Sequence, residues 1–308
     1  MTSTLDETER LASPPAFQQV SPARKAKNAL ATVLVWLSFL IAVAPLVWVL
    51  YTVIANGIKR IPYTNWWSED FGSVLSDEVG GGVLHAVIGT LEQGLMCAII
   101  SVPLGLLVAI YLVEYGGGSR LAKVTTFMVD ILSGVPSIVA ALFIYALWIT
   151  TFGLPRSGFA VSLALVLLMI PVVVRSAEEM LRIVPDDLRE ASYALGVPKW
   201  KTIMKIVLPT ALSGIIGGVM MALARVMGET APLLVLVGYS AYVNWDLFSN
   251  GQASLPLLMN TERATNSMEP GSVGFDRIWG AALTLVIIIA VINLLATVVS
   301  RLVAPKKK

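Results

Sequence analysis

The chain has 308 residues, of which 56% are hydrophobic and 14% are charged, whereas soluble domains are roughly 45–50% apolar and about 25% charged. A soluble core cannot absorb this excess without exposing apolar runs to water, so the composition excludes an ordinary soluble protein and indicates one embedded in a bilayer. The formal net charge of only +2 predicts no nucleic-acid partner.

The amino-terminal segment 1–28 is polar and ends in the basic cluster Arg24, Lys25 and Lys27. Low hydrophobicity of this kind predicts a disordered cytoplasmic lead. The apolar run 29–54 that follows is longer than the roughly 7–15 residues of a signal-peptide core, so we expect it to be retained as the first membrane helix. From there, residues 29–305 are predicted to form one transmembrane domain.

Five further apolar runs have about the length needed to cross the hydrocarbon core of a bilayer as helices; they are 84–113, 124–152, 159–174, 211–237 and 278–303. Isolated segments satisfy their backbone groups in lipid only as helices, and these runs lack the alternation of barrel strands. The sequence therefore predicts an all-α integral membrane protein with about six transmembrane helices.

The distribution of lysine and arginine predicts the orientation, because these residues accumulate in cytoplasmic segments. The two termini and the connections 114–123 and 175–205 together hold sixteen of them. The opposite side holds five, namely Lys59, Arg60, Arg156, Arg263 and Arg277. Both termini are therefore predicted to be cytoplasmic.

The cytoplasmic connection 176–209 is amphipathic and unusually charged for a short membrane loop. Asp186 and Asp187 provide a helix start, because Asp side chains can cap free backbone N–H groups. Apolar residues then recur at helical spacing, Gly196 ends the first helix and Pro198 opens a second. The pattern predicts a helix-turn-helix whose apolar stripe is covered either by the membrane surface or by a groove on a partner protein.

Two arginines are candidates for contact with a transported anion. Arg225 lies about 21 Å along the run 211–237, where an arginine costs at least about 2.5–3.5 kcal/mol and needs a partner or a function. Glu229 follows at i+4 and would share its helix face, which leaves open a self-neutralising ion pair or a cation held ready for an anion. Arg175, with Glu179 at the same spacing, is the second candidate, for which ordinary cytoplasmic placement is the alternative.

An oxyanion such as phosphate suits these arginines, because guanidinium offers a planar fork of donors and stays charged when desolvated. Thr230 would add a hydroxyl, and the Glu229 carboxylate would favour an anion that still carries a proton. The sequence contains no Gly-rich nucleotide loop ending in Gly-Lys-Ser/Thr, so ATP and Mg²⁺ are expected on another chain. With one His and one Cys, no catalytic residue, cofactor or metal site is predicted, and the chain is not expected to be an enzyme.

The cytoplasmic connection also carries a family resemblance. It resembles the EAA loop of ABC importer permeases at Glu190, Ala191, Ser192, Gly196, Ile206, Leu208 and Pro209. Ser192 is the only departure, since the family pattern has Ala there. The resemblance implies a type I ABC importer permease fold and a loop that docks in a cleft of a cytoplasmic ATPase, with Glu190 and Gly196 central to that contact.

Three segments narrow the resemblance to phosphate-uptake permeases of the PstA type. They are Leu132-Ser133-Gly134-Val135-Pro136-Ser137-Ile138, Arg175-Ser176-Ala177-Glu178-Glu179-Met180-Leu181 and Ala224-Arg225-Val226-Met227-Gly228-Glu229-Thr230-Ala231-Pro232-Leu233. The similarity extends over about residues 30–305. In that family, the arginines that match Arg175 and Arg225 are implicated in phosphate passage. The resemblance implies a subunit of a phosphate importer in the lipid of the bacterial inner membrane. Its expected partners are a homologous second permease, a dimer of ATP-binding subunits and an extracytoplasmic phosphate-binding protein. Import of another oxyanion, such as phosphonate, sulfate or molybdate, is the alternative.

Overall fold

The computed structural model describes residues 21–75 and 78–303, and the chain divides into two units, Met1–Thr52 and Val53–Lys308. The first apolar run lies in the helix α2 (Pro22–Gly57), which is long and apolar enough to cross a membrane. This helix begins within the segment predicted as a disordered lead, so residues 22–28 are helical. Residues 1–20 of that lead lie outside the described residues.

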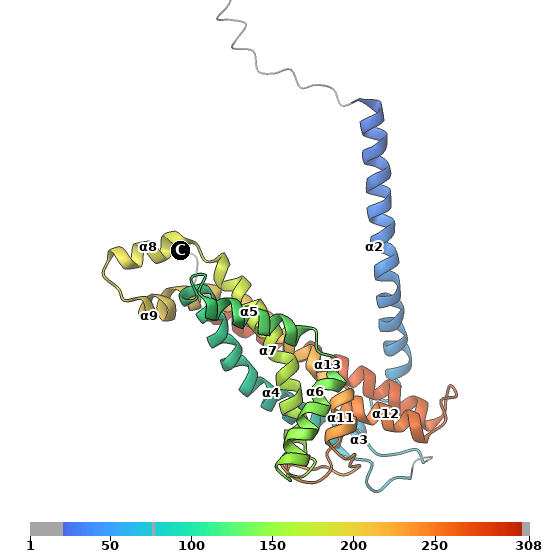
Figure 1. Ribbon diagram of the computed structural model, residues 1–308. Coiled ribbons are helices and arrows are strands. Elements are labelled where there is room, and N and C mark those ends of the chain that lie inside the picture. The colour runs from blue at the N-terminus through green and yellow to red at the C-terminus, as the bar shows by residue number, and fades with distance from the viewer. Residues whose placement is uncertain (1–20, 76–77, 304–308) are drawn as a thin grey trace, which may run out of the picture. The chain divides into compact units, whose positions relative to one another are not determined.

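The second unit is a bundle of helices, and no strand occurs in its described residues (Figure 1). Its elements in chain order, with η for π-helical segments, are α3 (Thr64–Ser68), α4 (Leu84–Ile110), η1 (Tyr111–Tyr115), α5 (Arg120–Ser133), α6 (Ser137–Ile144), η2 (Tyr145–Thr151), α7 (Gly158–Ile183), α8 (Asp186–Ala194), α9 (Lys199–Thr202), η3 (Ile203–Val207), α10 (Leu208–Met227), α11 (Ala231–Leu236), α12 (Leu255–Thr265) and α13 (Val273–Val303).

Five helices of the described chain are long and apolar enough to cross a membrane, and a bent pair of helices makes a sixth span. The prediction of one continuous helix over 124–152 is wrong, because α5 and the α6–η2 segment meet at an angle of 104°. Gly134 ends α5, and Pro136 precedes α6. A residue before proline is disfavoured in the α-helical region, so Val135 cannot easily continue the helix.

The prediction of one helix over 211–237 is also wrong. The helix α10 ends at Met227, and the short helix α11 begins at Ala231, with Pro232 in its first turn. Proline is favoured at the start of a helix and disfavoured in its interior, so the break falls between the two. At the other end the helix is longer than predicted, because α9, η3 and α10 form one helix of 29 residues.

Helix α7 lies at the centre of the bundle, and most of the residues in its apolar stretch are buried inside the protein. It packs against α4 and α10 through glycines. A Cβ added at Gly218 of α10 would lie 1.6 Å from Ser176 Oγ, and one at Gly105 of α4 would lie 2.7 Å from Val173 Cγ1. Small residues let membrane helices approach closely, so these contacts fix α10 and α4 on either side of α7.

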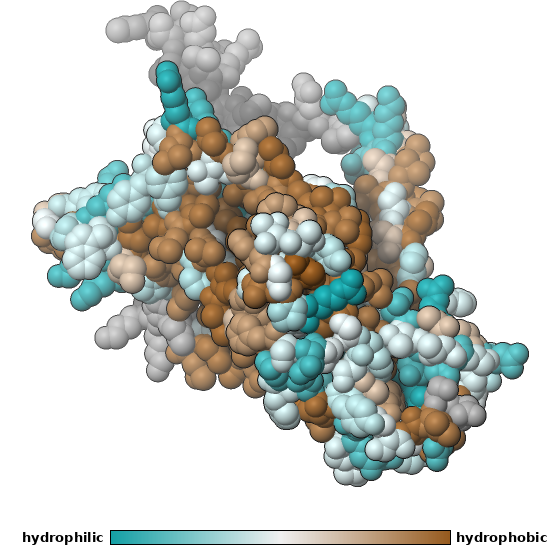
Figure 2. All heavy atoms as spheres, turned by 60° about the horizontal axis from the view of Figure 1, so that its bottom comes forward, coloured by the Kyte–Doolittle hydropathy of each residue, from teal (hydrophilic) through white to brown (hydrophobic). Residues whose placement is uncertain are grey.

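The two ends of the bundle differ in composition. The helices α8 and α9 lie at one end, and α3, α11 and α12 lie toward the other (Figure 1). Hydrophobic side chains cover the middle of the bundle, and hydrophilic ones gather over the loops at the α3 and α12 end (Figure 2). Exposed apolar side chains along α4 and α6, such as Leu95, Leu107 and Phe143, would cost free energy in water and are suited to lipid.

Candidate functional site: an exposed face of α10 and the α8–α9 loop

One face of α10 is exposed along its whole length. The exposed positions recur every three or four residues, at Thr210, Ser213, Gly217, Met221, Arg225 and Gly228. Only Met221 among them is large and apolar, with 73% of its surface exposed. Lipid-facing helix surfaces are rich in large apolar residues, so this stripe of small and polar residues is suited to a water-filled path or to another helix.

Arg225 lies in the last turn of α10 and is exposed. Within the described chain, its side chain makes no hydrogen bond or ion pair. The predicted pairing with Glu229 is absent because the helix ends before Glu229, so the two residues no longer share a helix face. Arg225 is therefore at the end of its helix rather than in the middle, and its guanidinium is available to an external anion.

Glu229 and Thr230 lie in the break between α10 and α11, and both are half-buried. Glu229 lines a cavity of about 10 Å³ together with Thr90, Gln93 and Ser254. Thr230 is the first residue flanking α11 and makes no side-chain capping bond there. The structure thus places Glu229 among side chains of α4 and the α12 start, apart from the exposed α10 stripe.

Arg175 of α7 is held by two carboxylates. Its guanidinium pairs with Asp130 of α5, and with Glu178 at 3.0 Å; Glu178 also pairs with Arg182 at 2.7 Å. The predicted partner Glu179 is exposed and takes no part in this chain of charges. The sequence analysis did not identify Asp130 as the partner of Arg175. A carboxylate within an apolar run indicates such a pairing, because a charged side chain in the membrane needs a partner.

A cavity of about 490 Å³ brings α7 and the exposed face of α10 together. Arg175, Ser176 and Glu179 line it from α7, and Gly217 and Met221 of the α10 stripe line it from the other side. Arg225 is one helical turn beyond Met221 on the same stripe, about 12 Å from Gly217 at 1.5 Å per residue. The two predicted arginines therefore border the same face of the bundle.

The connection between α7 and α10 forms the predicted helix-turn-helix. Gly196 has φ +74° between α8 and α9, a conformation that glycine adopts at no steric cost. Asp186 and Asp187 lie in the first turn of α8, where their negative charge interacts favourably with the positive end of the helix dipole. The predicted cap bond is absent, because Pro185 occupies the N-cap position. Asp186 instead accepts a hydrogen bond from Arg189 at 3.1 Å.

Ser192, the departure from the family pattern, has a structural explanation. Its side chain is buried, at 3% exposure, and its hydroxyl lies 2.8 Å from the hydroxyl of Thr202 on α9. A buried hydroxyl costs free energy unless it is hydrogen-bonded, so Thr202 compensates for the serine. The bond also joins α8 to α9.

The outer surface of this loop is apolar and uncovered. Leu195 is 83% exposed, Trp200 62% and Met204 59%; Glu190 and Ala191 are exposed beside them. Leu208 and Pro209 open α10, directly after the π-helical turn η3. Proline offers no N–H to the preceding turn, which accounts for the irregular hydrogen bonding there.

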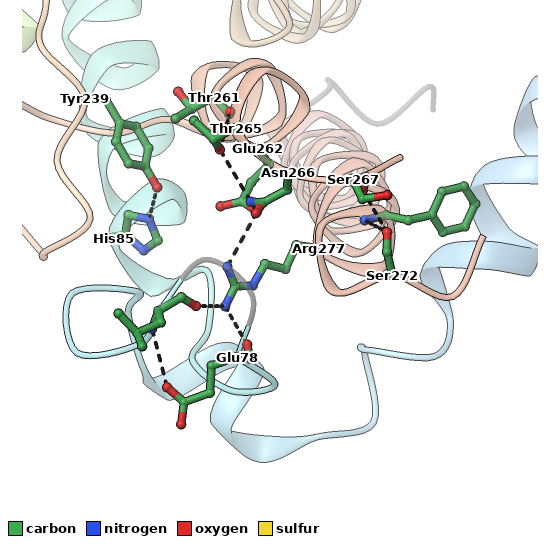
Figure 3. Close-up of polar contacts among 12 residues, drawn as sticks. Glu78, His85, Tyr239, Thr261, Glu262, Thr265, Asn266, Ser267, Ser272 and Arg277 are labelled. Atoms are coloured by element: carbon green, nitrogen blue, oxygen red, sulfur yellow. Dashed lines mark hydrogen bonds and ion pairs between the residues drawn. The ribbon is translucent and has the colours of Figure 1, made fainter. Parts of the chain in front are cut away.

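A buried arginine with several polar partners lies toward the other end of the bundle (Figure 3). Arg277 of α13 is only 1% exposed, so this residue, counted among the charges of the side opposite the cytoplasm, is buried within the protein. It lies 3.6 Å from the carboxylate of Glu262 on α12, donates to the carbonyls of Leu75 and Glu78 at 3.2 and 2.9 Å, and stacks 4.4 Å from the Phe71 ring. Arg277 thereby fastens the loop before α4 to α12 and α13.

The described part of the chain brings together no group of three His, Cys, Asp or Glu side chains that could hold a metal ion. The groups that the arrangement does expose are the guanidinium of Arg225, of a kind that can bind oxyanions, and the uncovered apolar side chains of the α8–α9 loop.

Comparison with known proteins shows which family the chain resembles. Residues 101–308 match the family described as "Binding-protein-dependent transport system inner membrane component". The chain is 54% identical over 306 residues to the phosphate transport system permease protein PstA 1 of Mycobacterium tuberculosis, and the match covers 99% of each of the two chains. It is 57% identical over 290 residues to the phosphate transport system permease protein PstA of Mycobacterium leprae, which covers 94% of each.

A solved structure has a similar fold. The chain matches a subunit of a bacterial ABC transporter involved in the import of the acidic polysaccharide alginate, with a TM-score of 0.60 over 92% of this chain and all of that one. The two sequences are 14% identical, so the likeness concerns the fold alone, which is that of a type I ABC importer permease.

Proposed function

Because the chain belongs to the family of binding-protein-dependent transport system inner membrane components, and within it to the PstA type, we propose that it is the phosphate-conducting permease subunit of an ATP-driven importer in the bacterial inner membrane. The observation that carries this proposal is 54% identity to a phosphate permease over 99% of both chains. Identity at this level across the full length leaves the alternative oxyanions, phosphonate, sulfate and molybdate, without comparable support.

We propose that Arg225 and Arg175 contact phosphate in turn as it moves along the exposed face of α10. Arg225 has an unengaged guanidinium within the described chain, which supports its role as the first of the two contacts. Arg175 lines the cavity of about 490 Å³ and is already neutralised by Asp130 and Glu178. A partly neutralised arginine binds an anion less tightly, so phosphate reaching it can be released rather than trapped.

The proposed partners follow from the surfaces that the chain leaves uncovered. A homologous second permease would complete the path opposite the α10 stripe. A dimer of cytoplasmic ATP-binding subunits, carrying ATP and Mg²⁺, would cover the exposed Leu195, Trp200 and Met204 of the loop. An extracytoplasmic phosphate-binding protein would deliver phosphate at the α3 and α12 end. With this orientation, the charge distribution of the sequence supports the proposal that both termini are cytoplasmic.

Uptake of labelled phosphate by a strain that lacks this chain and every other phosphate transporter tests the substrate. We expect phosphate uptake to be lost, to return with the plasmid-borne chain, and sulfate uptake to stay unchanged. Normal phosphate uptake in the deletion strain, or a selective loss of sulfate uptake, would contradict the proposal.

Replacement of Gly196 by valine should uncouple ATP hydrolysis from uptake. A non-glycine residue at positive φ costs roughly 1–2 kcal/mol, which lowers the population of a correctly formed loop roughly 5–30-fold. We expect the purified importer in proteoliposomes to keep hydrolysing ATP while phosphate uptake per ATP falls.

Gly271 provides the matched control, because it also has positive φ, at +91°, and, like Gly196, would leave an added Cβ with no atom within 4 Å. Gly271→Val should keep the wild-type ratio of phosphate to ATP. An equal fall in both variants would mean that backbone strain in general, and not the α8–α9 turn, is responsible.

A further inference from the structure

A buried carboxylate at the end of α4 has no part in the proposed passage of phosphate. Glu114 lies in η1, directly after α4, and is 8% exposed. It is buried beside the α8–α9 loop rather than beside the α10 stripe. A buried charge is costly unless it is paired and hydrogen-bonded, so its partners indicate what it does.

The first partner is Arg189 of α8. Its Nε and Nη2 donate to Oε1 of Glu114 at 3.1 and 2.9 Å. The same guanidinium donates to the carbonyls of Val184 at 2.6 Å and Leu181 at 3.0 Å, which belong to the end of α7. One side chain of the loop is thus bonded both to the end of α4 and to the end of α7.

The second partner is Lys199, the first residue of α9. Its ammonium donates to the backbone carbonyl of Glu114 and lies 5.0 Å from the centre of the Tyr115 ring. Carbonyls at the end of a helix lack an intrahelical donor and favour a nearby cation. Both helices of the loop, α8 and α9, are therefore attached to the same residue, one through its side chain and the other through its main chain.

The connectivity of the chain makes these bonds informative. α8 follows α7 after two residues, and α9 continues through η3 into α10, so movement of the loop passes to α7 and α10 along the covalent backbone. α4 has no such connection to the loop. The contacts at Glu114 provide a noncovalent connection between α4 and the loop. Only 12% of the Arg189 side chain and 4% of the Glu114 side chain are exposed, so solvent screens this ion pair little.

We propose that Glu114 is a positioning residue that carries the movement of the α8–α9 loop to α4, so that α4, α7 and α10 move together when the ATPase closes. The inference rests on the proposed function, because it assumes that the loop docks on an ATPase. It adds a residue, and a transmembrane helix, that lie outside the loop itself.

Glu114→Gln in the complete importer, reconstituted in proteoliposomes with its binding protein, tests the proposal. Glutamine keeps the size of the side chain and removes its charge. We expect ATP hydrolysis per complex to remain and phosphate transported per ATP to fall about tenfold, which corresponds to about 1.4 kcal/mol. Glu114→Asp, which restores the charge, should recover part of the ratio.

Asp186→Asn is the matched control, because Asp186 also bonds Arg189 at 3.1 Å but has a side chain that is 85% exposed and lies on α8 itself. It should keep the wild-type ratio. A purely structural role for Glu114 would instead lower assembly, ATP hydrolysis and uptake in parallel, with an unchanged ratio, and would overturn the proposal.

Lys199→Gln keeps the test decisive if Glu114→Gln fails to assemble. Lys199 is exposed, and its loss leaves the Glu114 side chain in place while it removes the bond to the Glu114 carbonyl and the contact with the Tyr115 ring. A lowered ratio in Lys199→Gln supports the proposal, and an unchanged ratio in that variant overturns it. A wild-type importer that hydrolyses ATP but transports no phosphate would refute the proposed function instead.

Discussion

Arg225→Gln should lower phosphate uptake by at least about 100-fold while the importer still assembles. A guanidinium offers two parallel hydrogen bonds to an oxyanion, and each hydrogen bond to a charged group contributes about 1.5–3 kcal/mol. Since about 1.4 kcal/mol corresponds to a factor of ten, the loss of both bonds corresponds to at least about 100-fold. The cost to stability should be small, because an exposed arginine in the last turn of a helix gains only about 0.3–1 kcal/mol from the helix dipole.

Uptake of labelled phosphate and recovery of the purified complex measure the two effects separately. Arg225→Lys keeps the charge but loses the planar fork, so its uptake should be intermediate. Arg301→Gln, which removes an exposed arginine from the last turn of α13, is the matched control and should transport normally. Failure of Arg225→Gln to assemble would show that the arginine is structural and would contradict its place in the pathway.

Arg277→Leu should destabilise the protein by about 3–5 kcal/mol, because removal of one partner leaves the buried charge of Glu262 uncompensated. The substitution also leaves the carbonyls of Leu75 and Glu78 without their donor. Chemical denaturation in lipid nanodiscs measures the loss of stability. Hydrogen exchange should become faster in the loop that precedes α4, since that loop loses its attachment to α13.

The loss should depend on pH, because burial already raises the pKa of Glu262 while Arg277 lowers it. Without Arg277 the pKa of Glu262 in the folded state rises further above its unfolded value. A carboxyl whose pKa is higher in the folded state does not lower the stability of the fold at pH values below its pKa in the unfolded state. The loss of stability grows as the pH rises from that value toward the pKa in the folded state. Arg277→Leu should therefore lose least stability near pH 4 and most near pH 7.

Two further variants separate charge burial from general damage. Arg263→Leu, on the exposed side of α12, should change stability by no more than about 0.5 kcal/mol. Glu262→Leu combined with Arg277→Leu should recover part of the loss, because it removes the buried carboxylate as well. A double variant as unstable as Arg277→Leu alone would assign the effect to the two carbonyls rather than to Glu262.

Much of the fold was predictable because membrane solvation imposes a simple pattern on the sequence. Apolar runs of sufficient length must be helical in lipid, so the membrane helices were found at nearly their observed places. What hydropathy could not show is that apolar runs conceal breaks. Pro136 and Gly228 are compatible with a membrane environment, and the 104° bend and the end of α10 follow from backbone geometry and not from polarity.

The candidate site was predictable where its residues are close in sequence and not where they are distant. The loop pattern placed Gly196 and the two short helices correctly, since each signal is local. The pairing of Arg225 with Glu229 assumed a continuous helix and was wrong. Asp130 as the partner of Arg175, and Glu114 as the partner of Arg189, are separated by 45 and 75 residues, and no spacing rule connects them.

The elements α9, η3 and α10 form one unbroken helix from Lys199 to Met227, so a tilt at one end displaces the other end by a larger distance. Arg225 lies about 39 Å from Lys199 along it at 1.5 Å per residue, so a tilt of about 10° about the α9 end would displace the guanidinium by roughly 7 Å. That distance exceeds the reach of a hydrogen bond. In the proposed pathway, a small rotation at the end that carries the α8–α9 loop is thus sufficient to bring Arg225 to phosphate or to take it away.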